Sequence, residues 1–259
     1  MAIVPSLSAI IIETTNFQKM TGFIAPNTLF ILDVDDTLLI PTQALGTDVW
    51  FGYRMGQYLE KGESHSDALE KTLAEWEAIR HLTQVAIVEQ GTETVIEQLQ
   101  KTHPLMCLTT QGLALATRTL QQLESLQIDP SIAAPYKNDL YFMNGHNMST
   151  NVQGVLYRKG ILFTSGTHKG KATLKFLEMI DYHPDRIVFI NDKASHLQEV
   201  EDSVKEKGIE FIGLRYSYSD ERVSQFDKHL ADFQWKYSTL DHLLSDQEAA
   251  EKMFINQGN

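Results

Sequence analysis

The chain has 259 residues, of which 42% are hydrophobic and 22% are charged, and its net charge is −12. This length and composition suit one large domain, or one domain that carries a smaller insertion, and argue against wholesale disorder. The acidic balance excludes nucleic-acid binding through a general basic field, which needs clustered lysine and arginine. The single cysteine, Cys107, excludes an intrachain disulfide and a zinc site built from several cysteines.

Neither a membrane span nor a standard export signal is expected. No apolar run approaches the roughly 20 residues that a membrane helix needs. The start, MAIVPSLSAIII, is mildly apolar, but Pro5 interrupts it and no basic residue precedes it. We therefore predict a cytoplasmic protein that binds no membrane, and the sequence leaves export by another signal open. Asn147-Met148-Ser149 matches a glycosylation sequon, a pattern that is common by chance and has no meaning in a cytosolic chain.

The first strong strand is predicted at TLFILDVD, residues 28–35, and a helical segment follows it. The strand is apolar throughout rather than alternating, which is typical of a strand covered on both faces. From Pro41 to about Gln90 the pattern changes, and residues 48–62 and 65–90 both predict helices. In the second helix, four apolar residues recur at helical spacing, which indicates an ordinary packing face. They are Leu69, Leu73, Trp76 and Ile79.

Strands and helices alternate through the rest of the chain. The pattern predicts helices at 92–101, 112–126, 169–180 and 194–208 and from Asp220 onward, and apolar strands at 104–110, 185–192 and 209–216. Residues 130–167 are less regular and suggest turns and short strands, with a hairpin around Arg158-Lys159-Gly160. This alternation predicts an α/β fold with a parallel sheet and right-handed crossovers.

Three of the predicted strands end in polar residues that suit one shared site. In open α/β sheets, ligands bind beyond the carboxyl ends of the strands. The residues found there are Asp33, Asp35, Asp36, Thr37, Thr109, Thr110, Asn191 and Asp192. A site of oxygen donors without a histidine or cysteine cluster favours Mg²⁺ over zinc or copper. A bound cation would also offset the repulsion among close carboxylates.

The same residue types suit phosphoryl transfer. Aspartate is a known covalent nucleophile in aspartyl-phosphate chemistry. Phosphoryl transfer also needs a cation and positive groups around the equatorial oxygens of the phosphoryl group. Lys169 and Lys171, at a predicted helix start, are candidate sources of that positive charge.

Four motifs resemble those of the haloacid-dehalogenase-like (HAD) phosphohydrolase superfamily. DVDDTLL after FIL resembles the Asp-x-Asp-x-Thr motif at the end of the first core strand, and MCLTT resembles the second motif, a strand that ends in Thr or Ser. KGKATL resembles the third motif, a lysine that opens a helix, and VFIND resembles the fourth, an apolar strand before an acidic pair. The resemblance covers roughly residues 28–38 and 92–215. The combination of LTT, LYRKGILFTSG and HKGKATLKFL is similar to an uncharacterised HAD-like family of intracellular bacteria.

This resemblance implies a Rossmann-like, three-layer α/β core and a role for each matching residue. Asp33 would be the nucleophile and a metal ligand. Asp35 would be the general acid and then the base, and its main-chain carbonyl would bind Mg²⁺. Thr109 would hold a phosphoryl oxygen, and Lys169 would steady the nucleophile and the transferred group. Asp192 would be the second metal-binding side chain.

Two positions depart from the family pattern. Asn191 stands where many members have Gly, Asp or Ser, and His196 stands where a further acid is usual. Metal binding by Asp192 is expected to survive, although the lost carboxylate would weaken it. Glu199 and Glu201 could replace the missing acid, but a solvated helix face is the expected setting for both.

Several neighbours of the motif residues are expected to play ordinary parts. Asp36 and Thr37 would support the loop after the first core strand, and Cys107 would be a small core residue. Lys171 and His168 are expected to be surface residues.

Other functions remain open at this level. SGTHKGKAT has the context of a nucleotide-binding loop, but Gly166 to Gly170 is one residue too short and Ala172 replaces the hydroxyl that would bind Mg²⁺. A signalling receiver also combines acids, a Thr and a Lys, but the chain is too long for one and no aspartate ends the LTT strand. A catalytically weak or inactive HAD-like scaffold that binds a partner or acts as an effector, and a phosphotransferase, stay as alternatives.

The sequence as a whole predicts a Mg²⁺-dependent phosphatase that hydrolyses a small phosphomonoester through an aspartyl-phosphate on Asp33. Its core would comprise residues 1–39 and 92–259, with a small helical cap inserted at 40–91 that closes over the site. Five cap residues are candidates for facing the substrate, and packing within the cap is an equal alternative for the aromatic ones. They are Trp50, Phe51, Tyr53, Arg54 and Tyr58. Residues 130–167 could add a small flap. The sequence does not identify the substrate or the oligomeric state.

Overall fold

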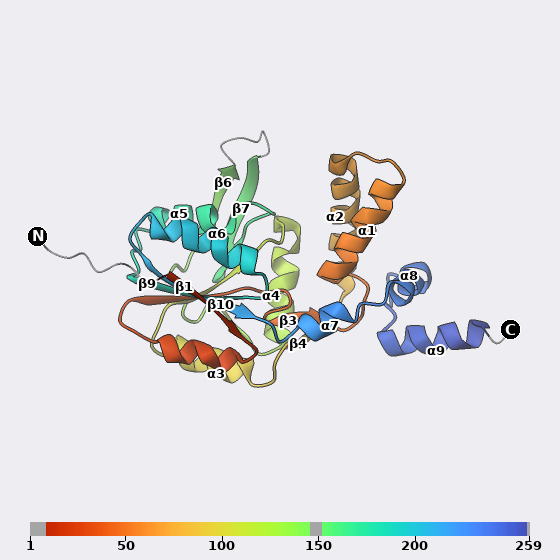
Figure 1. Ribbon diagram of the computed structural model, residues 1–259, viewed down its shortest axis with the longest axis horizontal. Coiled ribbons are helices and arrows are strands. Elements are labelled where there is room, and N and C mark those ends of the chain that lie inside the picture. The colour runs from red at the N-terminus through yellow and green to blue at the C-terminus, as the bar shows by residue number, and fades with distance from the viewer. Residues whose placement is uncertain (1–8, 146–151, 258–259) are drawn as a thin grey trace, which may run out of the picture. The chain divides into compact units, whose positions relative to one another are not determined.

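The structure is a computed structural model that describes residues 9–145 and 152–257 (Figure 1). The sequon at Asn147-Met148-Ser149 and the first eight residues of the predicted N-terminal segment lie outside these ranges. Contacts between Cα atoms divide the chain into two compact units. The first unit comprises residues 1–38 and 87–219, and the second comprises residues 39–86 and 220–259.

Helices and strands alternate along most of the first unit. Its strands are β1 (Ala9–Thr14), β2 (Thr28–Leu32), β5 (Leu105–Thr109), β6 (Leu140–Gly145), β7 (Val152–Arg158), β8 (Ile161–Phe163), β9 (Arg186–Asn191) and β10 (Glu210–Tyr216). Its helices are η1 (Phe17–Phe23), α3 (Thr92–Gln100), η2 (Leu113–Leu115), α4 (Ala116–Ser125), α5 (Lys169–Met179) and α6 (Ala194–Lys205).

One eight-stranded sheet, in the order β1-β10-β9-β2-β5-β8-β7-β6, forms the centre of this unit. The strands from β1 to β8 in that order are parallel, and β7 and β6 are antiparallel additions. α5 and α6 pack together on one face of the sheet, and α3 lies on the other (Figure 1). The predicted α/β fold with a parallel sheet and a Rossmann-like arrangement is therefore confirmed.

The core explains why the central strands are apolar throughout. All five residues of β2 and all five of β5 are buried. Leu29 and Ile31 of β2 belong to a cluster that includes Ala172 and Phe176 of α5 and Leu197 of α6. Because side chains alternate along a strand, the other residues of β2 face the opposite side, so both faces need apolar residues.

The edges of the sheet differ from the sequence prediction. AIIIET forms β1, which pairs in parallel with β10, although no strand was expected there. The irregular segment 130–167 adds β6, β7 and β8 to the sheet rather than a separate flap. The hairpin predicted at Arg158-Lys159-Gly160 is confirmed, because β7 and β8 pair in antiparallel fashion on either side of it. Lys159 and Gly160 have φ values of 45° and 80°, as a tight type I′ hairpin turn requires.

The second unit is built from two separate stretches of the chain. Its elements are β3 (Leu39–Pro41), α1 (Asp48–Glu60), α2 (His65–Leu82), β4 (Val85–Ile87, at the boundary), α7 (Asp220–Ser224), α8 (Lys228–Tyr237) and α9 (Asp246–Gln257). β3 and β4 form a two-stranded sheet where the chain leaves and re-enters the first unit.

The C-terminal residues 220–259, which were assigned to the core from the sequence, instead pack with the insertion. The Leu45 main-chain N–H donates to Oε1 of the fully buried Gln234 at 2.9 Å. The Trp50 and Trp235 rings lie 5.9 Å apart between centroids. These polar and aromatic contacts join α1 and the loop before it to α8, and no local pattern in the sequence indicates them.

α2 is shorter than predicted, and its buried face is displaced from the expected one. The helix ends at Leu82 rather than near Gln90, because Thr83 takes an extended conformation and its hydroxyl donates to the Ile79 carbonyl. Leu73 is 38% exposed, so it is not part of the packing face. The residues that are buried are Ala68, Thr72, Trp76, Ile79 and Arg80.

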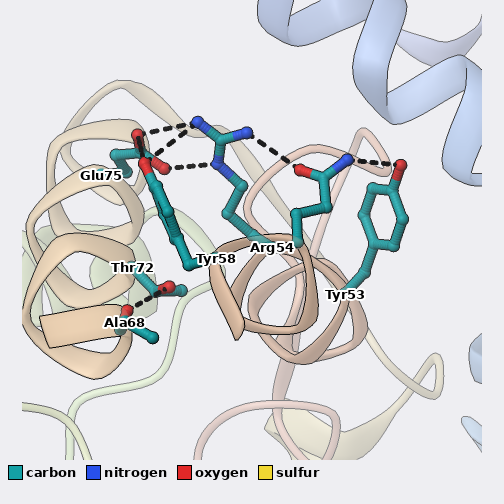
Figure 2. Close-up of polar contacts among 7 residues, drawn as sticks. Tyr53, Arg54, Tyr58, Ala68, Thr72 and Glu75 are labelled. Atoms are coloured by element: carbon teal, nitrogen blue, oxygen red, sulfur yellow. Dashed lines mark hydrogen bonds and ion pairs between the residues drawn. The ribbon is translucent and has the colours of Figure 1, made fainter. Parts of the chain in front are cut away.

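The aromatic and arginine side chains of α1 make internal contacts. Trp50 is 1% exposed, and the Phe51 ring packs edge-on against Trp76. Figure 2 shows Arg54 of α1 paired through two nitrogens with Glu75 of α2, at 2.6 and 2.9 Å. Trp50 is thus a packing residue rather than a substrate-facing one, and the Arg54 charge is balanced within the unit.

The same network continues to the C-terminal segment. Tyr58 donates to Glu75 at 2.5 Å, and Gln57 accepts from Arg54 and donates to Tyr53 (Figure 2). Tyr53 donates to Asp232 of α8 at 2.7 Å. Burial and the Asp232 carboxylate raise the pKa of Tyr53 to about 12, so its hydroxyl keeps its proton at neutral pH. The network holds α1, α2 and α8 together.

The Glu75 carboxylate should make the stability of this unit depend on pH. Burial raises its pKa, but the hydrogen bonds from Arg54 and Tyr58 and the Arg54 charge lower it more, so the folded pKa is below the ordinary value. A group with a lowered folded pKa stabilises the fold above its unfolded pKa, and this contribution is lost as the pH falls through the folded value.

We expect the difference in unfolding midpoint between wild type and Glu75→Gln to be largest near neutral pH and to shrink below about pH 4. Glu70→Gln, at an exposed position of the same helix, is the control and should show no such trend. Thermal unfolding at a series of pH values measures both. A difference that stays constant across the series would contradict the role given to Glu75.

Candidate active site

The loop after β2 carries two of the predicted catalytic carboxylates. Asp33 is 5% exposed and Asp35 is half-buried. Asp36 has a φ of 57°, a left-handed conformation that aspartate tolerates better than most residues. The Asp36 carbonyl accepts from the Ser219 hydroxyl at 2.8 Å, and the Leu38 N–H donates to the Val34 carbonyl at 2.9 Å. The tight turn fixes the direction in which the carboxylates leave the strand, and it matches the supporting role expected for Asp36.

Asp33 forms a buried ion pair with Lys169. The Lys169 ammonium lies 2.5 Å from Oδ1 of Asp33, and the two side chains are only 1% and 7% exposed. Lys169 is the first residue of α5, and its main-chain N–H donates to Glu199 of α6 at 2.9 Å. A charge this deeply buried needs an opposite charge beside it, and here the Asp33 carboxylate and the Lys169 ammonium are partners of each other. The pairing of Asp33 with Lys169 is the contact on which the predicted site depends.

Glu199 corrects one sequence prediction. It was expected on a solvated helix face, but its carboxylate caps the first N–H of α5, at the end of a helix where negative charge is stabilising. His168, expected to be a simple surface residue, is the N-cap of α5 and accepts from the Lys171 N–H at 3.3 Å. Lys171 itself is exposed, as predicted.

Gly170 allows α5 to approach α6 closely enough for this arrangement. A Cβ atom added at Gly170 would overlap the Glu199 carbonyl and the Ser203 hydroxyl. We expect Gly170→Ala to lower the free energy of unfolding by about 1–3 kcal/mol, because the two helices must move apart.

Gly22→Ala is the control for this change, since a Cβ atom there meets nothing within 4 Å. It should alter stability by no more than about 0.5 kcal/mol. Denaturant unfolding measures both variants. Equal stabilities would show that the α5–α6 contact is not tight.

The end of β5 supplies Thr109, which is 1% exposed. Its hydroxyl accepts from the Gln111 N–H at 3.1 Å, and its carbonyl accepts from the Thr164 N–H at 2.9 Å. The Gln111 side chain donates to Oδ2 of Asp35 at 2.7 Å, which connects the end of β5 with the loop after β2. Sequence reasoning missed Gln111, because a single glutamine after a strand carries no recognisable pattern.

The end of β9 is joined to the same loop by two hydrogen bonds. The Asp33 N–H donates to the Ile190 carbonyl at 3.0 Å, and the Asp192 N–H donates to the Thr37 hydroxyl at 3.1 Å. Thr37 therefore supports the loop as predicted. Asn191 is fully buried, and its Oδ1 accepts from the Lys193 N–H at 2.7 Å. The structure thus brings the predicted residues of β2, β5, β9 and α5 to one end of the sheet.

The donor set at this end consists of oxygen atoms. Among residues 9–145 and 152–257, no group of three or more His, Cys, Asp or Glu side chains could hold a metal ion. Mg²⁺ needs fewer, because it binds through one or two carboxylates and completes its shell with water and substrate phosphate. The Asp33 and Asp192 carboxylates and the Asp35 carbonyl fit that requirement, and they do not fit a zinc site.

Cys107, next to this end of the sheet, takes no part in metal binding or nucleophilic chemistry. It pairs with Leu32 across β2 and β5 and is fully buried. Burial raises the pKa of its thiol, and the Asp33 carboxylate raises it further, so the thiol stays protonated. The prediction of a core residue is confirmed.

Comparison with known families assigns the chain. The model of the family described as "Protein of unknown function (DUF2608)" matches residues 13–250. The chain belongs to this family. The match spans both units, including the segment that packs with the insertion.

Relatives of this DUF2608 protein occur in Chlamydia. Two proteins of Chlamydia pneumoniae, each named "Putative outer membrane protein", are 26% and 27% identical to it over 246 and 242 residues. These matches cover 93% and 92% of this chain and 89% and 88% of the two relatives. A protein of Chlamydia trachomatis with the same name is 23% identical, and the match covers 86% of this chain and 81% of that relative.

Among solved structures, the DUF2608 protein is similar to a haloacid dehalogenase-like family hydrolase from Streptococcus pneumoniae, with a TM-score of 0.43 and 14% identity. The match covers 72% of this chain and 93% of that one. In the described part of the DUF2608 chain, no helix combines the length and the apolar composition needed to cross a membrane.

Proposed function

We propose that this DUF2608 protein is a Mg²⁺-dependent phosphomonoester hydrolase that works through an aspartyl-phosphate on Asp33. The observation that carries the proposal is the buried pair of Asp33 and Lys169 at the carboxyl end of β2. The Lys169 ammonium, 2.5 Å from Oδ1, balances the charge of the carboxylate that would act as the nucleophile, and it supplies positive charge where phosphoryl oxygens would lie. The four motifs that resemble the HAD superfamily lie at the ends of β2, β5 and β9 and at the start of α5, which supports the proposal.

The reaction can be written in two steps with these residues. In the first, an Asp33 carboxylate oxygen attacks phosphorus, the bond from phosphorus to the leaving oxygen breaks, and Asp35 gives its proton to that oxygen. In the second, water attacks phosphorus, Asp35 takes a proton from the water, and the Asp33 carboxylate is released with phosphate. Thr109 and Lys169 hold phosphoryl oxygens through both steps. The Asp33 and Asp192 carboxylates and the Asp35 carbonyl would hold Mg²⁺, which would supply charge stabilisation when bound.

The test is release of phosphate from a panel of small phosphomonoesters that includes p-nitrophenyl phosphate, with Mg²⁺ and with EDTA. We expect turnover that depends on Mg²⁺. No turnover across the panel would favour the alternative, a HAD-like scaffold without catalytic activity that serves as a binding or effector protein. Release of the substrate alcohol with transfer of phosphate to a second alcohol would favour a phosphotransferase.

We also propose a cytoplasmic location, since a small phosphorylated metabolite is the expected substrate. The names of the chlamydial relatives point to the cell envelope instead. Immunodetection of the protein in cytoplasmic and envelope fractions of the native cell separates the two, and recovery in the envelope fraction would contradict the cytoplasmic location.

A further inference from the structure

Gln111 is a buried side chain just after β5 whose polar groups contact the end of β5 and three other segments. It is 3% exposed. Its Nε2 donates to Oδ2 of Asp35 at 2.7 Å, and its Oε1 accepts from the Thr119 hydroxyl of α4. Its main-chain N–H donates to the Thr109 hydroxyl, and its carbonyl accepts from the Ser165 N–H, both at 3.1 Å. Since both ends of the side-chain amide and both main-chain groups have partners, Gln111 has little freedom to move.

The Thr119 hydroxyl determines which end of the amide faces Asp35. To act as the acid, Asp35 carries its proton on one oxygen. The other oxygen, Oδ2, can then only accept a hydrogen bond, so the amide turns Nε2 toward it. The Oε1 atom then needs a donor in a buried place, because an unsatisfied buried acceptor costs about 1–3 kcal/mol. Thr119 is 1% exposed and supplies that donor. Without its hydroxyl, the preferred orientation of the amide would be lost.

We propose that Gln111 is a positioning residue for Asp35 and that Thr119 orients Gln111. This inference rests on the proposed hydrolase function, because it concerns proton transfer by Asp35 to the leaving oxygen. A hydrogen bond to Oδ2 restricts rotation of the Asp35 carboxyl group about its bond to Cβ, and so fixes where its other oxygen lies. Asp35 is half-buried on a turn, and Gln111 connects it to the rigid end of β5.

A positioning role predicts a loss that depends on the leaving group. p-Nitrophenolate leaves without being protonated, whereas phenolate needs the proton from Asp35, and the two substrates are similar in shape. We expect Gln111→Leu to lower kcat/KM for phenyl phosphate by about 10- to 100-fold, and for p-nitrophenyl phosphate by about tenfold less. KM should change little, because Gln111 is buried and contacts Asp35 rather than substrate.

Thr119→Val should produce the same selective loss. Thr119→Ser, which keeps the hydroxyl, should keep wild-type activity on both substrates. Thr119→Val and Thr119→Ser both change the side-chain volume little. They therefore test the positioning role even if thermal unfolding shows that Gln111→Leu does not fold. Gln100→Leu is the matched control. Its amide donates to the Asp129 carbonyl at 2.7 Å at the end of α3, and its loss should leave both substrates unaffected.

The outcomes separate this inference from the function on which it rests. Wild type that hydrolyses neither substrate overturns both. Active wild type with equal losses for the two substrates in Gln111→Leu and Thr119→Val, or with losses confined to KM, overturns the positioning role alone. A selective loss in Gln111→Leu and Thr119→Val, together with wild-type activity in Thr119→Ser, supports the positioning role.

Discussion

Asp33→Asn should lower kcat for phosphomonoester hydrolysis by at least about 10³-fold, because loss of a covalent nucleophile removes the route rather than one interaction. The substitution is nearly isosteric and keeps an oxygen that can accept from Lys169. The folded structure should therefore persist, and a thermal unfolding scan would verify this. Wild type incubated with substrate and quenched in acid should carry the mass of one phosphoryl group, and Asp33→Asn should not.

Asp181→Asn is the matched control for this variant, because that carboxylate is 96% exposed and lies at the opposite end of the sheet, before β9. Purified in the same way, it should retain wild-type turnover. Loss of turnover in Asp33→Asn purified beside it then excludes a contaminating phosphatase. Turnover of Asp33→Asn within about tenfold of wild type would show that no aspartyl-phosphate forms at this position.

Lys169→Met should have the largest effect on stability. It leaves the Asp33 carboxylate buried without its cation, and removing one member of a buried pair costs about 3–5 kcal/mol. The double variant Asp33→Asn with Lys169→Met should recover part of this loss, since neither charge then remains. Denaturant unfolding of the four proteins gives the coupling energy between the two residues.

Lys171→Met provides the comparison within the same helix, because Lys171 is exposed. Its free energy of unfolding should stay within about 0.5 kcal/mol of wild type. If Lys169→Met and Lys171→Met were equally stable, the Asp33–Lys169 contact would contribute nothing to folding.

The parts of the fold that were predicted correctly carry their signal locally. Four of the strands are short apolar runs bounded by turn residues: β2, β5, β9 and β10. Such runs can be recognised as strands from the sequence without knowing which strands they pair with. β1 was missed because AIIIET resembles any mildly apolar N-terminal stretch until β10 is in place beside it. The division into units was wrong at the C-terminus for the same reason. The contacts of α8 with the insertion join residues nearly 200 positions apart in the chain.

The candidate site shows the same limit. Asp33, Thr109, Lys169 and Asp192 follow strands or open a helix, so their meeting could be inferred from the rule that parallel strands end on one side. Gln111, Thr119 and Glu199 have no such marker, and their parts depend on how α4 and α6 pack. The sequence also could not separate packing from substrate contact for Trp50, because an aromatic residue on a helix suits either.

The packing of residues 220–259 with residues 39–86 has an evolutionary consequence. An insertion held by its own contacts could be exchanged between relatives by replacing one continuous stretch of gene. Here Gln234 accepts from the Leu45 N–H, and Asp232 accepts from Tyr53, so each stretch completes the other. A chimaera that received only one of them would lose these partners and expose buried polar groups. A functional exchange of the unit outside the sheet therefore has to move both stretches together.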